Sequence, residues 1–186
     1  MEKTYTPSHT CPWWLLFTFD NRIRRLVHDP IKILTPHVQS GATVLDIGCG
    51  MGYFTLPLAQ LVGPKGGVIA VDVQHKMLEG LRRRAERAGL MDRIRILHCA
   101  PDRIGLDQRL DFALAFWMVH EVKQPEPFLK EIYDVLKPGG GLLLVEPKIH
   151  VSRNVFENTV VLAQNSGYKT VARPMVWGSR STFFLK

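Results

Sequence analysis

Residues 44–55, Val-Leu-Asp-Ile-Gly-Cys-Gly-Met-Gly-Tyr-Phe-Thr, constrain the fold of this chain more than any other stretch. An apolar run with one acidic residue meets three glycines at alternate positions, and residues that can form a helix follow. This order predicts a strand, a tight turn and a helix start. Glycine permits a positive φ and carries no Cβ, so a bulky adenosyl ligand can lie against the main chain. The stretch therefore predicts a cofactor site at the carboxyl edge of a parallel α/β sheet.

The spacing of the glycines argues against two common cofactor classes. A dinucleotide fingerprint has glycines at its first, third and sixth positions, but the sixth position counted from Gly48 is Tyr53. A triphosphate-binding loop ends in Lys followed by Ser or Thr, and no such pair follows the glycines. The turn therefore favours neither a dinucleotide nor a nucleoside triphosphate.

Strand and helix patterns alternate along most of the chain. The expected strands are short apolar runs at 43–47, 68–72, 94–98, 111–116 and 142–146. The expected helices are 53–62, 75–88, 125–136 and 152–166, with two short helices inside 20–34 and a terminal hairpin of 168–174 with 179–185. Residues 137–141 read as a sharp helix stop that leads into the fifth strand. The β–α–β–α–β order predicts a parallel sheet with right-handed crossovers.

Three separated motifs resemble those of class I S-adenosylmethionine-dependent methyltransferases. The residues from Asp46 to Gly52 match the family pattern Asp-hydrophobic-Gly-Cys/Ser/Thr-Gly-x-Gly without a gap. The other two motifs are the acidic end of the second strand, Asp72, and Leu-Lys-Pro-Gly-Gly-x-Leu-Leu-Leu-Val-Glu-Pro at 136–147. The resemblance covers about residues 40–186. It implies an α/β, Rossmann-like three-layer sandwich, a seven-stranded mostly parallel sheet with the last strand antiparallel, and S-adenosyl-L-methionine as cofactor.

Two acidic residues are central to the predicted cofactor site. The resemblance makes Asp72 the acid that binds the ribose hydroxyls, although a carboxylate there also suits the N-cap of the next helix. Asp46 can bond the backbone N–H groups of the turn, orient a neighbouring side chain or tune the field near the sulfonium, and we expect the first role to dominate.

The remaining cofactor residues follow from their places beside the strand ends. Val73, Gln74 and Met77 either surround the adenine or form an ordinary helix face. The family often has Gly-Asp-Ala after the third strand, whereas this chain has Cys99 in the acidic position, so the adenine contact is lost, made by the backbone or taken over by Asp102. The full predicted set is Asp46, Gly48, Gly50, Gly52, Phe54, Asp72, Val73, Gln74, Met77, Cys99, Ala100, Phe116 and Trp117. Within this set, the main chain of Gly48 and Gly50 and that of Phe116 and Trp117 is expected to hold the methionine moiety.

His120 is the candidate catalytic residue. Methyl transfer is an in-line displacement that depends mainly on alignment, and a general base is needed only where the acceptor must lose a proton. An imidazole titrates near neutrality, and Val-His-Glu-Val at 119–122 is similar to the Leu-His-His-Val of small-molecule methyltransferases. The alternative is that this histidine packs or supports without touching the acceptor.

The acceptor class is narrowed by absent motifs. Amino-methylating nucleic-acid enzymes carry Asp/Asn/Ser-Pro-Pro-Tyr/Phe after the fourth strand, where this chain has Phe-Trp-Met-Val at 116–119. Carbon-5 cytosine enzymes need a cysteine nucleophile near strands four or five, and arsenite enzymes need more thiols than Cys11 and Cys99 supply. A small-molecule acceptor is left, and the quinone and sterol methyltransferases are the nearest resemblance.

Length and composition favour one cofactor-binding domain with an N-terminal arm. With 186 residues, the chain is expected to hold a domain at 41–186, and residues 1–40 form an arm with short helices. The aromatic residues Trp13, Trp14 and Phe17 either cap the core or form a lid over the acceptor pocket. Because no apolar run approaches a membrane span and no secretory signal is visible, we expect a cytoplasmic protein, as a monomer or homodimer. The cysteine spacing indicates no metal site.

The net charge of +7 leaves a nucleic-acid partner open. Arg82, Arg83, Arg84 and Arg87 fall in one expected helix, and their simplest interpretation is a solvated face. Three functions therefore stand: a small-molecule methyltransferase, which we favour; an RNA or protein methyltransferase that docks through basic faces; and a non-catalytic module that binds S-adenosylmethionine.

Overall fold

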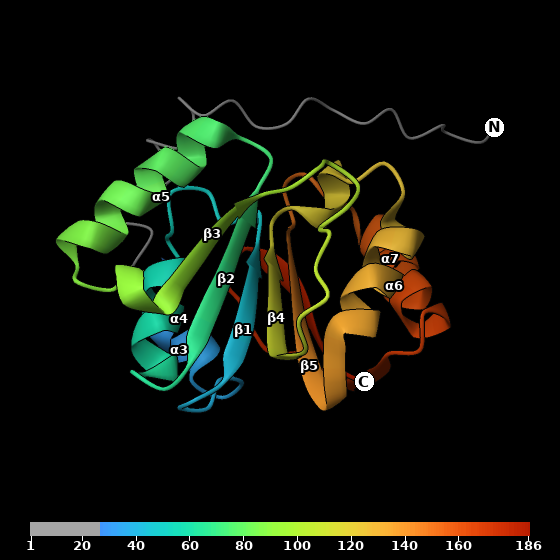
Figure 1. The fold of residues 1–186 in the computed structure, drawn as a ribbon. Coiled ribbons are helices and arrows are strands. Elements are labelled where there is room, and N and C mark those ends of the chain that lie inside the picture. The colour runs from blue at the N-terminus through green and yellow to red at the C-terminus, as the bar shows by residue number, and fades with distance from the viewer. Residues whose placement is uncertain (1–26) are drawn as a thin grey trace.

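The computed structural model describes residues 27–186, in which one seven-stranded sheet lies between two layers of helices (Figure 1). The strands are β1 (Thr43–Ile47), β2 (Gly67–Asp72), β3 (Ile94–His98), β4 (Leu110–Phe116), β5 (Leu136–Pro147), β6 (Lys169–Ala172) and β7 (Ser179–Leu185). The helices are α3 (Pro30–Leu34), α4 (Thr55–Val62), α5 (His75–Arg87), α6 (Pro125–Val135) and α7 (Arg153–Asn165), with short 3-10 turns η1 (Met91–Arg93) and η2 (Val119–Glu121).

The strand order confirms the predicted α/β fold class. The sheet runs β3-β2-β1-β4-β5-β7-β6, and β7 is antiparallel to both of its neighbours while β1 to β5 pair in parallel. The order of strands along the sheet reverses between β1 and β4. A crevice at the carboxyl ends of the strands is expected at such a reversal, and the glycine turn follows β1 there.

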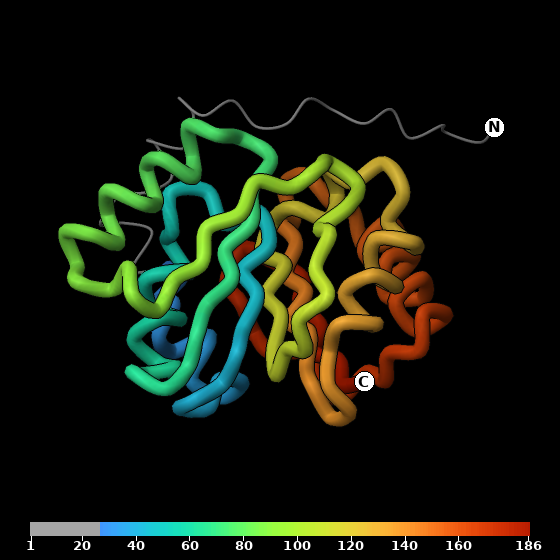
Figure 2. Tube along the Cα trace, in the orientation of Figure 1, coloured from blue at the N-terminus to red at the C-terminus, as the bar shows by residue number. Residues whose placement is uncertain are grey.

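Alternate residues of the central strands belong to two apolar clusters, one on each face of the sheet. Leu45 of β1 packs with residues of α6 and α7, whereas Val44 packs with residues of α3, α4 and α5. Figures 1 and 2 show these helices on opposite sides of the sheet. Because both faces are covered, the central strands are mostly apolar, as is typical of parallel strands, and Asp46 in β1 is a buried exception.

The start of β5 differs from the prediction. The expected helix stop at 137–141 belongs to the strand, which begins at Leu136 directly after α6. The register shifts here, since Leu110 of β4 pairs with Leu136 while Phe112 pairs with Gly141. A Cβ on Gly140 would lie only 3.1 Å from the Leu110 carbonyl oxygen of β4 and 2.9 Å from that of Lys137, so glycine at this position lets the segment lie close against β4.

The predicted helix boundaries are otherwise close to those observed. α4 begins at Thr55, two residues later than expected, with Pro57 in its first turn. Asp29 caps α3 by accepting the backbone N–H groups of Ile31 and Lys32, which confirms the second of the two short helices. The first of them, and the aromatic arm with Trp13, Trp14 and Phe17, fall mainly or wholly outside the described residues.

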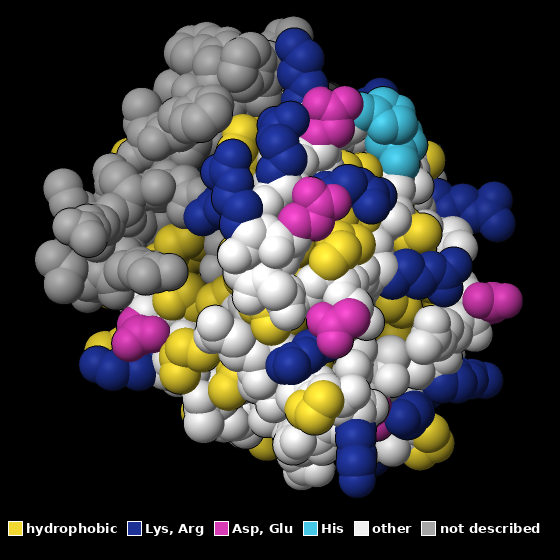
Figure 3. All heavy atoms as spheres, turned by 60° about the vertical axis from the view of Figure 1, so that its left-hand side comes forward, with side chains coloured by type: hydrophobic (Ala, Val, Ile, Leu, Met, Phe, Trp, Pro, Cys, Tyr) yellow, Lys and Arg dark blue, Asp and Glu magenta, His cyan; other side chains and the backbone are white. Residues whose placement is uncertain are grey.

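The arginines of α5 show the predicted solvated face with one exception. Arg82, Arg83 and Arg87 are exposed, but Arg84 is half-buried and its Nη1 donates to the Met51 carbonyl at 3.1 Å. On the coloured part of the face in Figure 3, lysine and arginine side chains predominate among the charged groups, with aspartate and glutamate side chains between them. This mixture does not form a continuous basic surface.

Candidate cofactor and acceptor site

The glycine turn is tied to the end of β2 by backbone and carboxylate hydrogen bonds. Gly48, Gly50 and Gly52 all have positive φ values, of 67°, 53° and 87°. The N–H groups of Gly48 and Cys49 donate to the Val71 carbonyl at 2.9 and 3.0 Å. These bonds align the turn with the carboxyl edge of the sheet, beside the reversal point.

The three glycines are required for different reasons. A Cβ on Gly52 would lie 2.4 Å from Cδ1 of Leu81 in α5, and one on Gly48 would lie 3.0 Å from Cβ of Met118. A Cβ on Gly50 would meet no atom within 4 Å. Two glycines therefore permit protein packing, and Gly50 alone borders open space that a ligand can enter.

Asp72 joins the glycine turn to the start of α5. Its Oδ2 accepts the Gly50 N–H and its Oδ1 accepts the Gln74 N–H, both at 2.9 Å. Burial raises the pKa of this carboxyl, and the backbone N–H groups oppose that shift. The helix N-cap is Gln74, so the capping alternative is wrong in detail. Each carboxylate oxygen keeps a further lone pair for a ribose hydroxyl.

Asp46 has a different partner from the one expected. Its Oδ2 accepts a 2.6 Å hydrogen bond from the Thr55 hydroxyl, while the N–H groups of the turn go to Val71 and Asp72. Alternation along β1 directs Asp46 toward α4, and Thr55 is the first residue of that helix. Burial raises the pKa of Asp46 to about 7 against the opposing effect of the Thr55 bond. The predicted dominant role is therefore wrong, and the second predicted role, orienting a side chain, fits.

The residues around the expected adenine position lie at the ends of β2 and β3. Cys99 is half-buried, its N–H donates to the Asp72 carbonyl at 3.2 Å, and burial with the nearby Asp72 raises its pKa to about 11. Oδ1 of Asp102 accepts the Lys123 N–H at 3.0 Å. Val73, Gln74 and Ala100 are accessible, but Met77 is fully buried, which favours the ordinary helix face for that residue.

Aromatic side chains close the site beyond β4. Phe54 and Phe116 pack with ring centroids 4.3 Å apart, and Trp117 has a φ of 61°, a strained value for a side chain of this size. The Trp117 N–H donates to the Val145 carbonyl at 2.7 Å. His28, which sequence reasoning missed, meets Phe116 and Trp117 edge-on at centroid distances of 5.6 and 5.1 Å. No local sequence pattern marks this contact.

His120 is paired with a buried carboxylate. Nδ1 of His120 lies 2.6 Å from Oε2 of Glu146, and the His120 backbone N–H donates to Oε1 at 3.1 Å. His150 stacks near it, with ring centroids 6.3 Å apart. The sequence alone does not reveal the pairing of His120 with Glu146. Because β4 and β5 are adjacent parallel strands, their carboxyl ends lie side by side. This adjacency is the signal that could have predicted the pairing of His120 with Glu146.

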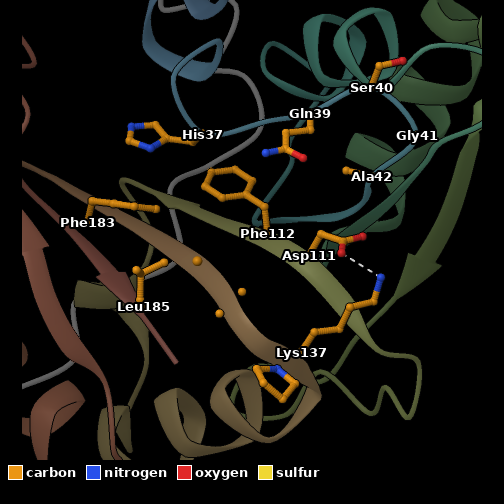
Figure 4. A pocket seen from close by; sticks show the side chains of 14 residues that line it. His37, Gln39, Ser40, Gly41, Ala42, Asp111, Phe112, Lys137, Phe183 and Leu185 are labelled. Carbon is orange, nitrogen blue, oxygen red and sulfur yellow. Dashed lines mark hydrogen bonds and ion pairs between the residues drawn. The ribbon is translucent and has the colours of Figure 1, made fainter.

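Two cavities lie away from the glycine turn. One of about 420 Å³ opens at the amino edge of β1, β4 and β5, where Lys137 pairs with Asp111 and His37 lies beside Phe112 and Phe183 (Figure 4). None of the predicted site residues lines it. Another of about 390 Å³ lies between the start of α7 and the loop before β7, and the residues that line it include Lys148 and Arg180.

Within residues 27–186, no group of three or more His, Cys, Asp or Glu side chains is arranged to hold a metal ion. The helices of this part of the chain are all too short or too polar to span a bilayer.

Comparison with known proteins decides the family. Residues 44–140 match the family model described as "Methyltransferase domain". The chain belongs to this family. A solved S-adenosylmethionine-dependent methyltransferase from Aquifex aeolicus superimposes with a TM-score of 0.83 and 26% identity, over 95% of this chain and 99% of that one. S-adenosylmethionine is therefore the cofactor of this methyltransferase domain.

Curated relatives extend the comparison to named activities. The demethylmenaquinone methyltransferase of Symbiobacterium thermophilum is 38% identical over 118 residues, which are 63% of this chain and 47% of the relative. The ubiquinone/menaquinone biosynthesis C-methyltransferase UbiE of Citrobacter koseri is 32% identical over 110 residues, or 59% of this chain and 44% of the relative. The chain spans about half the length of these curated relatives.

Proposed function

We propose that this methyltransferase transfers a methyl group from S-adenosylmethionine to a small-molecule acceptor. One observation carries the proposal: the turn that Asp72 fixes leaves open space at Gly50, at the sheet edge where His120 meets Glu146. Donor and acceptor sites at one sheet edge are what an in-line displacement requires. The bound cofactor supplies an electrophilic methyl group on a sulfonium, which leaves as a neutral thioether.

The residues at this edge suit the separate parts of the cofactor. Asp72 would accept the ribose hydroxyls with the lone pairs that Gly50 and Gln74 leave free. The main chain of Gly48 and Gly50, with that of Phe116 and Trp117, would hold the methionine moiety. Gly52 would pack against Leu81 and Phe54 against Phe116, and these contacts would hold the turn in place. Val73, Gln74, Cys99 and Ala100 would surround the adenine.

We extend the proposal to a quinol-like acceptor class, because the curated relatives carry names from demethylmenaquinone and ubiquinone methylation. Residues 1–40 would cover this acceptor as a lid over the domain at 41–186. A nucleic-acid acceptor is less well supported, since the curated relatives named above carry names from quinone methylation.

Ligand binding tests the proposal first. S-adenosylhomocysteine should raise the melting temperature of the protein, and NAD should not, because ligands that bind only the folded state stabilise it. The reverse order would contradict the cofactor assignment. Transfer of label from methyl-labelled S-adenosylmethionine to a metabolite panel that includes 1,4-naphthohydroquinone then tests the acceptor class. Cofactor binding without any transfer would point to the non-catalytic module, and transfer to RNA with steep salt dependence would point to a nucleic-acid enzyme.

A further inference from the structure

The Glu146 carboxylate holds His120 by two hydrogen bonds. One oxygen lies 2.6 Å from the ring Nδ1, and the other accepts the backbone N–H of the same residue at 3.1 Å. The Glu146 side chain is only 2% exposed. A buried carboxylate that holds both the ring and the main chain of one histidine fixes its position and orientation together.

This arrangement also determines the tautomer of the imidazole. A carboxylate accepts hydrogen bonds, so Nδ1 carries the proton and Nε2 keeps its lone pair when the ring is neutral. The structure gives Nε2 no hydrogen-bond partner among residues 27–186. The His120 side chain is 15% exposed, so the residues around it do not cover the ring completely. His120 therefore offers a proton acceptor at the edge of the cofactor site.

Charges around His120 favour proton uptake. Burial lowers its pKa, but the hydrogen bond and charge of Glu146 and the charge of neighbouring Glu121 outweigh burial and raise the pKa above its usual value. The third titratable group that faces the ring is His150, from the loop after β5. A raised pKa makes His120 a stronger base in its neutral form.

We propose that Glu146 positions His120 as the general base of methyl transfer, and that the acceptor is protic, with an O–H, N–H or activated C–H bond that breaks during the reaction. This inference rests on the proposed function and names the acceptor chemistry for the same site. The cofactor would leave as a neutral thioether that needs no proton, so a base at this position would serve only a proton on the acceptor. Acceptors without such a proton, such as thioethers and tertiary amines, need no base.

The step balances with the groups present. The acceptor atom forms a bond to the methyl carbon, and the methyl–sulfur bond breaks with its electron pair left on sulfur. The acceptor proton passes to Nε2 of His120. The imidazolium that forms beside Glu146 later releases this proton to water.

A titration of His120 tests the pairing without any acceptor. Nitrogen-15 NMR of the labelled protein should show Nδ1 protonated at high pH, and Glu146→Gln should lower the pKa of His120. Glu126→Gln is the matched control, because Glu126 is an exposed residue at the start of α6. An unchanged pKa in Glu146→Gln, or the Nε2–H tautomer in the wild type, would overturn the inference.

Methyl transfer to probe acceptors tests the base. Catechol and 1,4-naphthohydroquinone are protic, whereas dimethyl sulfide and pyridine carry no proton at the reacting atom. Transfer to the protic probes should fall by on the order of 100-fold or more in His120→Gln. In the wild type kcat should rise with pH to a plateau. Glu146→Gln should move the midpoint of this rise in kcat to lower pH, and Glu146→Asp should leave the midpoint closer to its wild-type value.

Two results separate this inference from the proposed function. Methylation of the aprotic probes, or a pH profile that His120→Gln leaves unchanged, would overturn the inference while methyl transfer itself stands. Cofactor binding with no transfer to any probe would contradict the proposed activity and the base together.

Discussion

The carboxylate of Asp72 accepts the backbone N–H of Gly50 at 2.9 Å, so the last residue of β2 fixes the centre of the glycine turn. If the same carboxylate binds the ribose, Asp72→Asn should weaken S-adenosylhomocysteine binding by about 1–3 kcal/mol, because charge-assisted bonds are lost. This corresponds to a Kd roughly 5- to 150-fold higher. Isothermal calorimetry on the purified variant measures it.

The matched control for this substitution is Asp107→Asn. Asp107 is exposed and lies before β4, away from the turn. It should keep the wild-type affinity. An unchanged Kd in a folded Asp72→Asn variant would refute the ribose assignment.

Gly50 and Gly89 form a matched pair for testing whether the open space at Gly50 belongs to the cofactor site. Both have positive φ values, of 53° and 64°, and a Cβ at either would meet no atom within 4 Å. Alanine should therefore cost each variant about 1–2 kcal/mol of folding stability through the same backbone strain. Only Gly50→Ala should also lose cofactor affinity, since its new methyl group would occupy the ligand space. Urea unfolding and calorimetry separate the two effects.

Equal affinities for S-adenosylhomocysteine in Gly50→Ala and Gly89→Ala would contradict this interpretation. The open space at Gly50 would then not belong to the cofactor site.

Sequence periodicity predicted the order of the elements because each strand and helix carries its own pattern of apolar residues. The antiparallel β7 came from the family resemblance and was confirmed. The start of β5 was mispredicted because glycine usually ends a helix or strand, and only the contact of Gly140 with β4 shows why the strand continues. Such close approaches depend on tertiary packing that a linear pattern does not contain.

The cofactor edge was predictable in its location but not in its hydrogen bonds. Asp46 was expected to bond the turn, whereas Thr55 takes that carboxylate, because strand alternation directs it toward α4. Gly52 is needed because it lies against Leu81 of α5, a helix that is distant from the turn in the sequence. Likewise, His120 and Glu146 are 26 positions apart in sequence, and only the adjacency of β4 and β5 brings them together.

The buried Asp46 should make folding stability depend on pH. Its pKa is about 7 in the folded protein, above the usual value of 3.8, so the folded state binds more protons between these values. Stability from this group is fully present below about pH 4 and is lost as pH rises through 7, by about 4 kcal/mol at most. Asp46→Asn cannot titrate. The free energy of unfolding of Asp46→Asn minus that of the wild type should therefore increase as the pH is raised through this window.

Urea unfolding at several pH values from 4.5 to 8 measures this difference. Thr55→Val removes the hydrogen bond that opposes the shift, so it should move the Asp46 midpoint to still higher pH. Thr55→Ser keeps a hydroxyl and serves as its control. Parallel stability curves for wild type and Asp46→Asn would show that the carboxyl does not titrate in this range.

Cys99 should report cofactor binding through its reactivity. Burial and Asp72 raise the pKa of this half-buried thiol to about 11, so at pH 8 it should react with iodoacetamide roughly 100-fold more slowly than a free cysteine. If adenine lies against Cys99, saturating S-adenosylhomocysteine should slow the reaction at least tenfold more. Peptide mass mapping distinguishes this site from the more buried Cys49, which should stay unmodified with and without ligand. A Cys99 rate that does not change, under conditions where the ligand raises the melting temperature, would place the adenine elsewhere along the sheet edge.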